Sequence, residues 1–183
     1  MNTVPDQHER ELARAALAVP PTPAEAGRRR DAAVERLRAA REALATEVGG
    51  VSAIEALRDD RWSVMHVLTH LGADGGGHFG PVYDMLEHGV RELEPYETRE
   101  ERFAAATEAA LEVIDGDIAF AAGLAEEQLL LHARKPDGEH YVVGYVEAAA
   151  EHLEAHVAQL RRIKERLAAI RERRQAATAA AGG

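Results

Sequence analysis

The sequence predicts an all-α protein, built as a four-helix bundle with a longer crossover between the third and fourth helices. Aromatic residues make up only 4% of the chain, while Ala, Glu, Leu and Arg are abundant, and this composition favours helix over strand. Apolar residues also recur every three to four positions through long segments, which is the period of one helix face. A chain of 183 residues is long enough to bury its own core, so we expect one domain.

The predicted boundaries follow breaks in this pattern. A short helix and a Pro-rich linker occupy residues 1–22, the bundle spans 23–174, and an Ala-rich tail over 175–183 is expected to be frayed. The bundle's first helix should begin after Thr22, whose hydroxyl can cap it, with Glu25 completing a capping box. It should end at Gly49-Gly50, and its predicted buried stripe is Ala33, Leu37, Ala40 and Leu44.

Two further capping boxes and one serine mark the next helices. Ser52 with Glu55 predicts a short helical turn, and Thr98 with Glu101 predicts a third long helix that ends near Leu124. The second long helix should begin at Ser63 and reach residues 87–89. The run Gly75–Gly77 interrupts it. This run indicates either a kink or a place where something approaches the backbone closely.

The crossover and the fourth helix complete the predicted bundle. Residues 131–143 lose the helical period, and Lys135-Pro136-Asp137-Gly138 is typical of a turn between two short extended segments, 129–131 and 141–143. The fourth helix should run from about Gly144 to beyond Ile170. Its predicted buried stripe is Val146, Leu153, Val157, Leu160, Ile163, Leu167 and Ile170.

Charge and composition exclude several classes of function. The net charge is −10, so we expect no nucleic-acid partner, and the arginines near the C-terminus alternate with acids as solvated helix faces do. The chain has no cysteine, which excludes disulfides, Cys-ligated zinc and a protein thiol nucleophile. No apolar run approaches membrane-spanning length, so we expect a cytoplasmic protein with no membrane partner.

The histidines carry the most chemistry. His152 and His156 lie one helical turn apart in the apolar stripe of the fourth helix, so both rings can point at one target. His156 should face inward and His152 should lie at the edge of the stripe. His66, His70 and His78 on the second helix are candidates for a third imidazole, and three imidazoles from two helices would make an open metal site. The alternative is an ordinary core histidine beside an interfacial one.

Other histidine sites are excluded by spacing or position. A zincin needs glutamate directly after its first histidine, whereas Glu154 is two places after His152 and projects from the opposite face. No histidine has glutamate three residues before it, which excludes a ferritin-like di-iron bundle. The remaining histidines lie outside the periodic stripes and are expected at the surface, although the crossover can present one of its two histidines, His132 or His140, to a pocket. They are His8, His88, His132 and His140.

Three segments of the chain resemble the DinB-like superfamily, which includes the bacillithiol and mycothiol S-transferases. In that family the second bundle helix opens with Trp-Ser and carries a ligand histidine eight residues after the Trp, matching Trp62-Ser63 and His70. A Gly turn in the crossover matches residues 136–138. The last helix carries His-x-x-x-His with Gln three residues on, matching His152, His156 and Gln159.

This resemblance implies a metal site formed by His70, His152 and His156, and it selects His70 over its two neighbours. It implies a divalent transition metal (Zn, Ni, Co or Fe) and a low-molecular-weight thiol, such as bacillithiol or mycothiol, as cofactors. The implied function is a metal-dependent thiol S-transferase or hydrolase acting on a small-molecule substrate, as a homodimer. The alternatives are a stress protein that binds metal or a small molecule without turnover, and a structural or dimerisation bundle.

Overall fold

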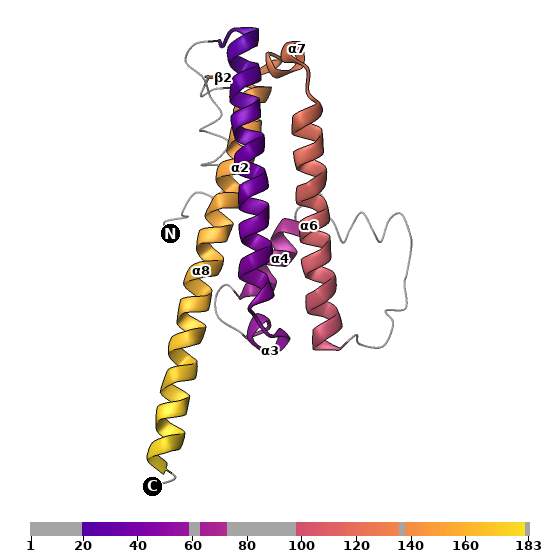
Figure 1. Ribbon diagram of the computed structural model, residues 1–183. Helices are drawn as coiled ribbons and strands as arrows, with labels where there is room; N and C mark the ends of the chain where they lie inside the picture. Colours follow the sequence, from indigo (N-terminus) through magenta and orange to yellow (C-terminus); the bar gives the residue numbers. More distant parts are fainter. Residues whose placement is uncertain (1–19, 59–62, 73–97, 136–137, 182–183) are drawn as a thin grey trace. The chain divides into compact units, whose positions relative to one another are not determined.

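The computed structural model describes residues 20–58, 63–72, 98–135 and 138–181 (Figure 1). These residues contain six helices and one two-stranded sheet, which confirms the all-α class. Several sequence-based predictions fall outside the described residues. They are the N-terminal short helix, Trp62, the Gly75–Gly77 interruption, the far end of the second long helix, the Pro136-Asp137 part of the crossover turn, and the histidines His8, His78 and His88.

The chain divides into two compact units. The first unit comprises residues 1–43 and 115–156, and the second comprises residues 44–114 and 157–183. Three long helices, α2 (Pro23–Gly49), α6 (Arg99–Gly123) and α8 (Val142–Ala181), each contribute residues to both units.

In the first unit, ion pairs join α2 to the beginning of α8. The helix α2 begins as predicted, because the Thr22 hydroxyl accepts a hydrogen bond from the backbone N–H of Glu25 at 3.3 Å. Arg29 donates two hydrogen bonds to Glu147, at 2.7 and 2.5 Å, and Arg36 makes a similar pair with Glu154 two turns further along. Paired donors of this kind fix the two helices in register because the guanidinium and carboxylate planes must match.

Small and aliphatic side chains form the core of the first unit. The predicted stripe of α2 is confirmed here, since Ala33, Leu37 and Ala40 are all buried. The buried apolar residues of this unit are Ala26, Ala33, Val34, Leu37, Ala40, Ala121, Leu124, Leu129, Tyr141, Val143, Val146, Ala150 and Leu153.

The crossover differs from the prediction in its boundaries. A short helix, α7 (Glu126–Leu129), precedes a β-hairpin formed by β1 (His132–Lys135) and β2 (Gly138–Tyr141), and α8 begins directly afterwards at Val142. Residues 129 and 142–143, expected in the extended pair, are therefore helical. The strands are antiparallel, with His132 opposite Tyr141 and Lys135 opposite Gly138. Gly138 has a φ of 141°, a conformation that residues with a side chain rarely adopt, so the turn determines where the strands pair.

In the second unit, capping boxes start the helices as predicted. Ser52 and Glu55 form a reciprocal box that opens α3 (Ala53–Ala56). Thr98 and Glu101 do the same for α6, because the Glu101 carboxylate accepts from Thr98 and the Glu101 N–H donates to the Thr98 hydroxyl. The helix α4 (Val64–Gly72) packs against α3. Gly72 lies against Ala109 and Ala110 of α6.

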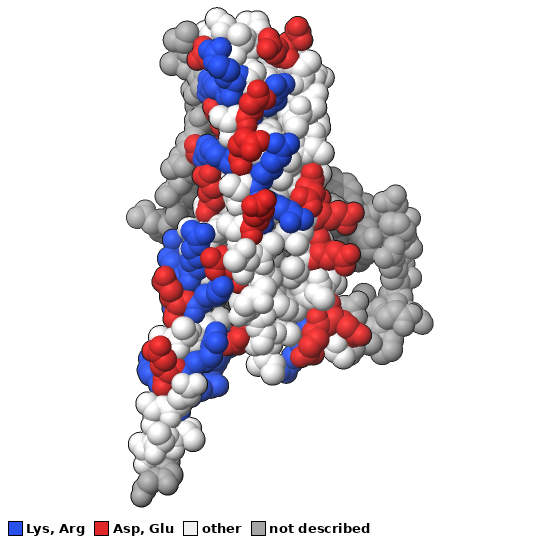
Figure 2. Space-filling view, in the orientation of Figure 1, with Lys and Arg blue, Asp and Glu red and all other residues white. Residues whose placement is uncertain are grey.

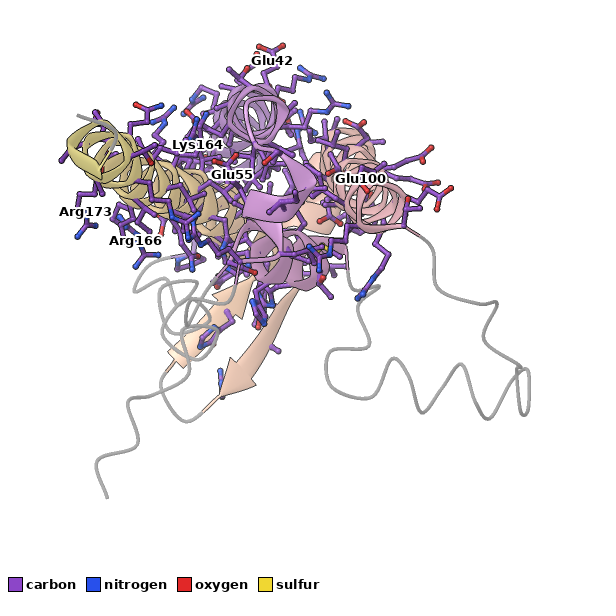
Figure 3. The ribbon with its side chains drawn as sticks, turned by 90° about the horizontal axis from the view of Figure 1, so that it is seen from below. Glu42, Glu55, Glu100, Lys164, Arg166 and Arg173 are labelled. Carbon is purple, nitrogen blue, oxygen red and sulfur yellow. The ribbon has the colours of Figure 1, made fainter. Side chains whose placement is uncertain are left out.

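Ion pairs also tie the last part of α8 to the other elements of this unit. Glu47, at the end of α2, accepts hydrogen bonds from Lys164 at 2.8 Å and from Arg161 at 3.0 Å. Arg171 lies 2.8 Å from Glu55 of α3. In Figure 3, Arg166 and Arg173 project from the outer side of α8. The buried apolar residues of the second unit are Leu44, Val48, Val51, Ala53, Ala56, Val64, Val67, Leu68, Ala110, Ile114, Val157, Leu160, Ile163 and Leu167.

The helix α8 is longer than expected. It spans 40 residues and continues to Ala181, through most of the segment predicted to fray. Its stripe is buried from Val146 to Leu167, as the sequence indicates, and Ile170 is half-buried. Acidic and basic side chains alternate along it in Figure 2. Among the helices that the structure describes, none combines the length and the apolar character needed to cross a lipid bilayer.

Candidate metal centre

Two imidazoles on α8 lie in direct contact. The Nε2 atoms of His152 and His156 are 3.1 Å apart, and the two rings are nearly perpendicular, with centroids separated by 4.4 Å. The helix accounts for this contact, because residues four positions apart lie one turn above each other on the same face. Both rings therefore direct the same nitrogen towards one point.

The burial of the pair agrees with the prediction. His156 is only 3% exposed and lies in the stripe between Leu153 and Leu160, both of which are buried. His152 is half-buried at the edge of that stripe. A buried imidazole needs a partner for its ring nitrogens, since leaving one unsatisfied costs on the order of 1–3 kcal/mol. A neighbouring imidazole or a cation satisfies this need equally well.

The third imidazole comes from α4. His70, in the last turn of that helix, is exposed. His70, His152 and His156 each offer one ring nitrogen, and the three nitrogens lie within 4.8 Å of one another. Of the His, Asp and Glu residues that the structure describes, these three form the one group close enough to hold a metal ion.

The spacing of these nitrogens is compatible with one bound metal ion. Two imidazole nitrogens bound tetrahedrally to one zinc ion, each at about 2.0–2.1 Å, lie roughly 3.3 Å apart. The 3.1 Å between the Nε2 atoms of His152 and His156 is close to that value. The donor set therefore suits a divalent transition metal.

The carboxylate between the two α8 histidines is held elsewhere. Glu154 accepts two hydrogen bonds from Arg36 of α2, at 2.8 and 2.6 Å. These hydrogen bonds lower the pKa of the Glu154 carboxyl below its usual value. Glu154 lies on the opposite side of the helix from the imidazoles, as the sequence indicates, so it is neither a ligand nor a base for this cluster.

His66 has a different role, which the sequence-based interpretation missed. Its Nδ1 lies 2.8 Å from the Ser63 hydroxyl and accepts a hydrogen bond from the Ser63 backbone N–H at 3.3 Å. In return, the backbone N–H of His66 donates a hydrogen bond to the Ser63 hydroxyl at 3.2 Å. This is a capping box with histidine in the place of glutamate. The spacing Ser-x-x-His at a predicted helix start was the signal that could have identified it.

The two crossover histidines lie in different environments. His132 is exposed, as predicted, and its ring lies 5.0 Å from that of Tyr141. His140 was expected at the surface, and this expectation is wrong, because it is only 1% exposed. The hairpin leads directly into α8 and brings the His140 ring to 6.2 Å from that of Tyr145. Helical periodicity gives no information about a strand residue, so the pattern could not place it.

Comparison with known proteins does not assign the chain to a group. No family model, no curated protein and no solved structure matches it.

Proposed function

We propose that this protein is a metal-binding four-helix bundle of the DinB-like type, in which His70, His152 and His156 hold one divalent transition metal. The observation that supports it is the convergence of three ring nitrogens, within 4.8 Å of one another, in a chain that has no cysteine. Three nitrogen ligands leave at least one position open for a small molecule, which is the arrangement of catalytic rather than structural sites.

The proposed reaction is S-transfer from a low-molecular-weight thiol, or hydrolysis of a small-molecule substrate, in a cytoplasmic homodimer. When bound, a divalent cation lowers the pKa of a thiol or water beside it towards neutrality. The chain's own residues supply three imidazoles, of which the two on α8 direct their Nε2 atoms towards one point, with His156 shielded from solvent. Zinc, nickel, cobalt and iron all accept such ligands.

The test is elemental analysis of protein purified without a chelator or a histidine tag. We expect about one equivalent of metal in the wild type and none in a His152→Ala/His156→Ala double variant. His132→Ala is the matched control, since His132 is exposed and lies outside the cluster, and it should retain the metal. Wild-type protein without metal that also fails to bind Zn²⁺ or Co²⁺ on titration would refute the proposal.

A second candidate is a stress protein that binds a metal or a small molecule without turnover. The engagement of Glu154 by Arg36 favours it, because the carboxylate that lies between the two α8 histidines in the sequence is held by an arginine and is not available as a general base. Stoichiometric metal together with no activity across a panel of thiols and electrophiles would support this candidate over the enzyme.

A further inference from the structure

The helix that carries His70 begins at an unusual cap. The carbonyl of Ser63 accepts the first hydrogen bond of α4, from the Val67 N–H at 3.2 Å, which makes Ser63 the N-cap residue. His66 is the third helical residue, the position that glutamate or glutamine occupies in an ordinary capping box. Ser63 is 3% exposed, so water has little access to the backbone N–H that His66 satisfies.

The cap requires one protonation state of the imidazole. A backbone N–H can only donate, so the Nδ1 atom that receives the Ser63 N–H must carry a lone pair. A protonated imidazole has an N–H at both nitrogens and cannot accept. It would also place a positive charge at a helix N-terminus, where the helix dipole disfavours it. Both effects act in the same direction.

The groups around α4 do not supply a competing partner. Within the part of the chain that the structure describes, no ion pair or hydrogen bond joins His66 to a residue other than Ser63. Glu55 of α3, the element packed against α4, accepts a hydrogen bond from Ser52 and forms an ion pair with Arg171. Besides His66, the titratable and charged groups on these elements are His70 on α4, Glu55 on α3 with Arg58 shortly after it, and Arg99, Glu100, Glu101, Arg102, Glu108, Glu112, Asp115 and Asp117 on α6.

We propose that His66 is a positioning residue, whose neutral imidazole caps α4 and thereby orders the helix that presents His70. Protonation of this imidazole opens the cap and loosens α4, because Nδ1 then no longer accepts the Ser63 N–H. The cap itself stands on the three hydrogen bonds to Ser63, whereas its effect on metal binding rests on the proposed function.

Amide hydrogen exchange of the metal-free, full-length protein tests the cap. From pH 7.5 to 5.5, after correction for intrinsic exchange rates, we expect the protection of α4 amides to fall about five-fold in the wild type. A His66→Gln variant keeps an acceptor at every pH and should change by less than about two-fold. His66→Ala should show weak protection at both pH values. The first turn of α6 is an internal reference, because its box uses the carboxylate of Glu101.

The same variants separate this proposal from the metal site. Because the Gln variant retains His70, His152 and His156, an equal loss of α4 protection in this variant and in the wild type would assign the effect to other groups and overturn the proposal. At pH 7.5 we expect His66→Ala to bind Zn²⁺ about five-fold more weakly and His66→Gln to restore the affinity. Equal Zn²⁺ affinity in the wild type, His66→Ala and His66→Gln overturns the positioning role. If none binds Zn²⁺, the proposed function fails, and with it the link to the metal, while the exchange result still decides the cap.

Discussion

The close approach of α4 to α6 at Gly72 yields the sharpest prediction about stability. A Cβ at this position would lie 3.0 Å from the backbone nitrogen of Ala110 and 3.3 Å from the carbonyl carbon and the Cβ of Ala109. Backbone atoms cannot move aside as a flexible side chain does, so Gly72→Ala must push the two helices apart by a few tenths of an ångström. Overpacking of this kind typically costs 1–3 kcal/mol, against a gain of up to about 1 kcal/mol in helix propensity.

We therefore expect Gly72→Ala to lower the free energy of unfolding by about 1–2 kcal/mol, measured by urea denaturation. Gly116→Ala in α6 is the matched control. Nothing lies within 4 Å of a Cβ there, and Gly138 is the only described glycine with a positive φ. This control should raise stability by roughly 0.5–1 kcal/mol. The reasoning is refuted if Gly72→Ala is as stable as the wild type while Gly116→Ala behaves as expected.

Three further predictions concern the core, an acid-sensitive ion pair and the metal. Leu160 is 1% exposed, so Leu160→Ala should cost about 2–4 kcal/mol in urea denaturation, and a loss below about 1 kcal/mol would contradict its place in a packed core. Hydrogen bonds from Lys164 and Arg161 lower the pKa of Glu47 in the folded protein. These hydrogen bonds therefore stabilise the fold fully above the pKa of Glu47 in the unfolded chain, about 4.5, and this stabilisation is lost as the pH falls through the lower pKa of the folded protein. Glu47→Gln should therefore lose about 1 kcal/mol at pH 7 and little at pH 3, and an equal loss at both would exclude the charged pair as its source. Excess Zn²⁺, at about 100 times its Kd, should raise the Tm of the wild type by roughly 5–10 °C and leave His152→Ala/His156→Ala unchanged, and an equal rise in both proteins would place the metal elsewhere.

The sequence alone determined the features that depend on near neighbours. The helix starts at Thr22, Ser52 and Thr98 follow from side chains that bond to a backbone three residues away. The contact between His152 and His156 follows from the rise and turn of a single helix. Burial of the α8 stripe follows from periodicity in the same way. These features depend on residues that lie within a few helical turns of each other in the sequence, so the local sequence is sufficient to predict them.

Tertiary structure decided what depends on residues distant in sequence. Periodicity alone left three histidines of the second helix as candidates, and the resemblance to the DinB-like superfamily favoured His70. The structure places His70 with the α8 pair and His66 in a cap. It also buries His140, which lies in a strand, where a helical pattern has no meaning. The hairpin register depends on how Gly138 turns the chain. Which faces of two separate helices come into contact depends on tertiary packing, so the local sequence of either helix cannot predict which of their side chains converge.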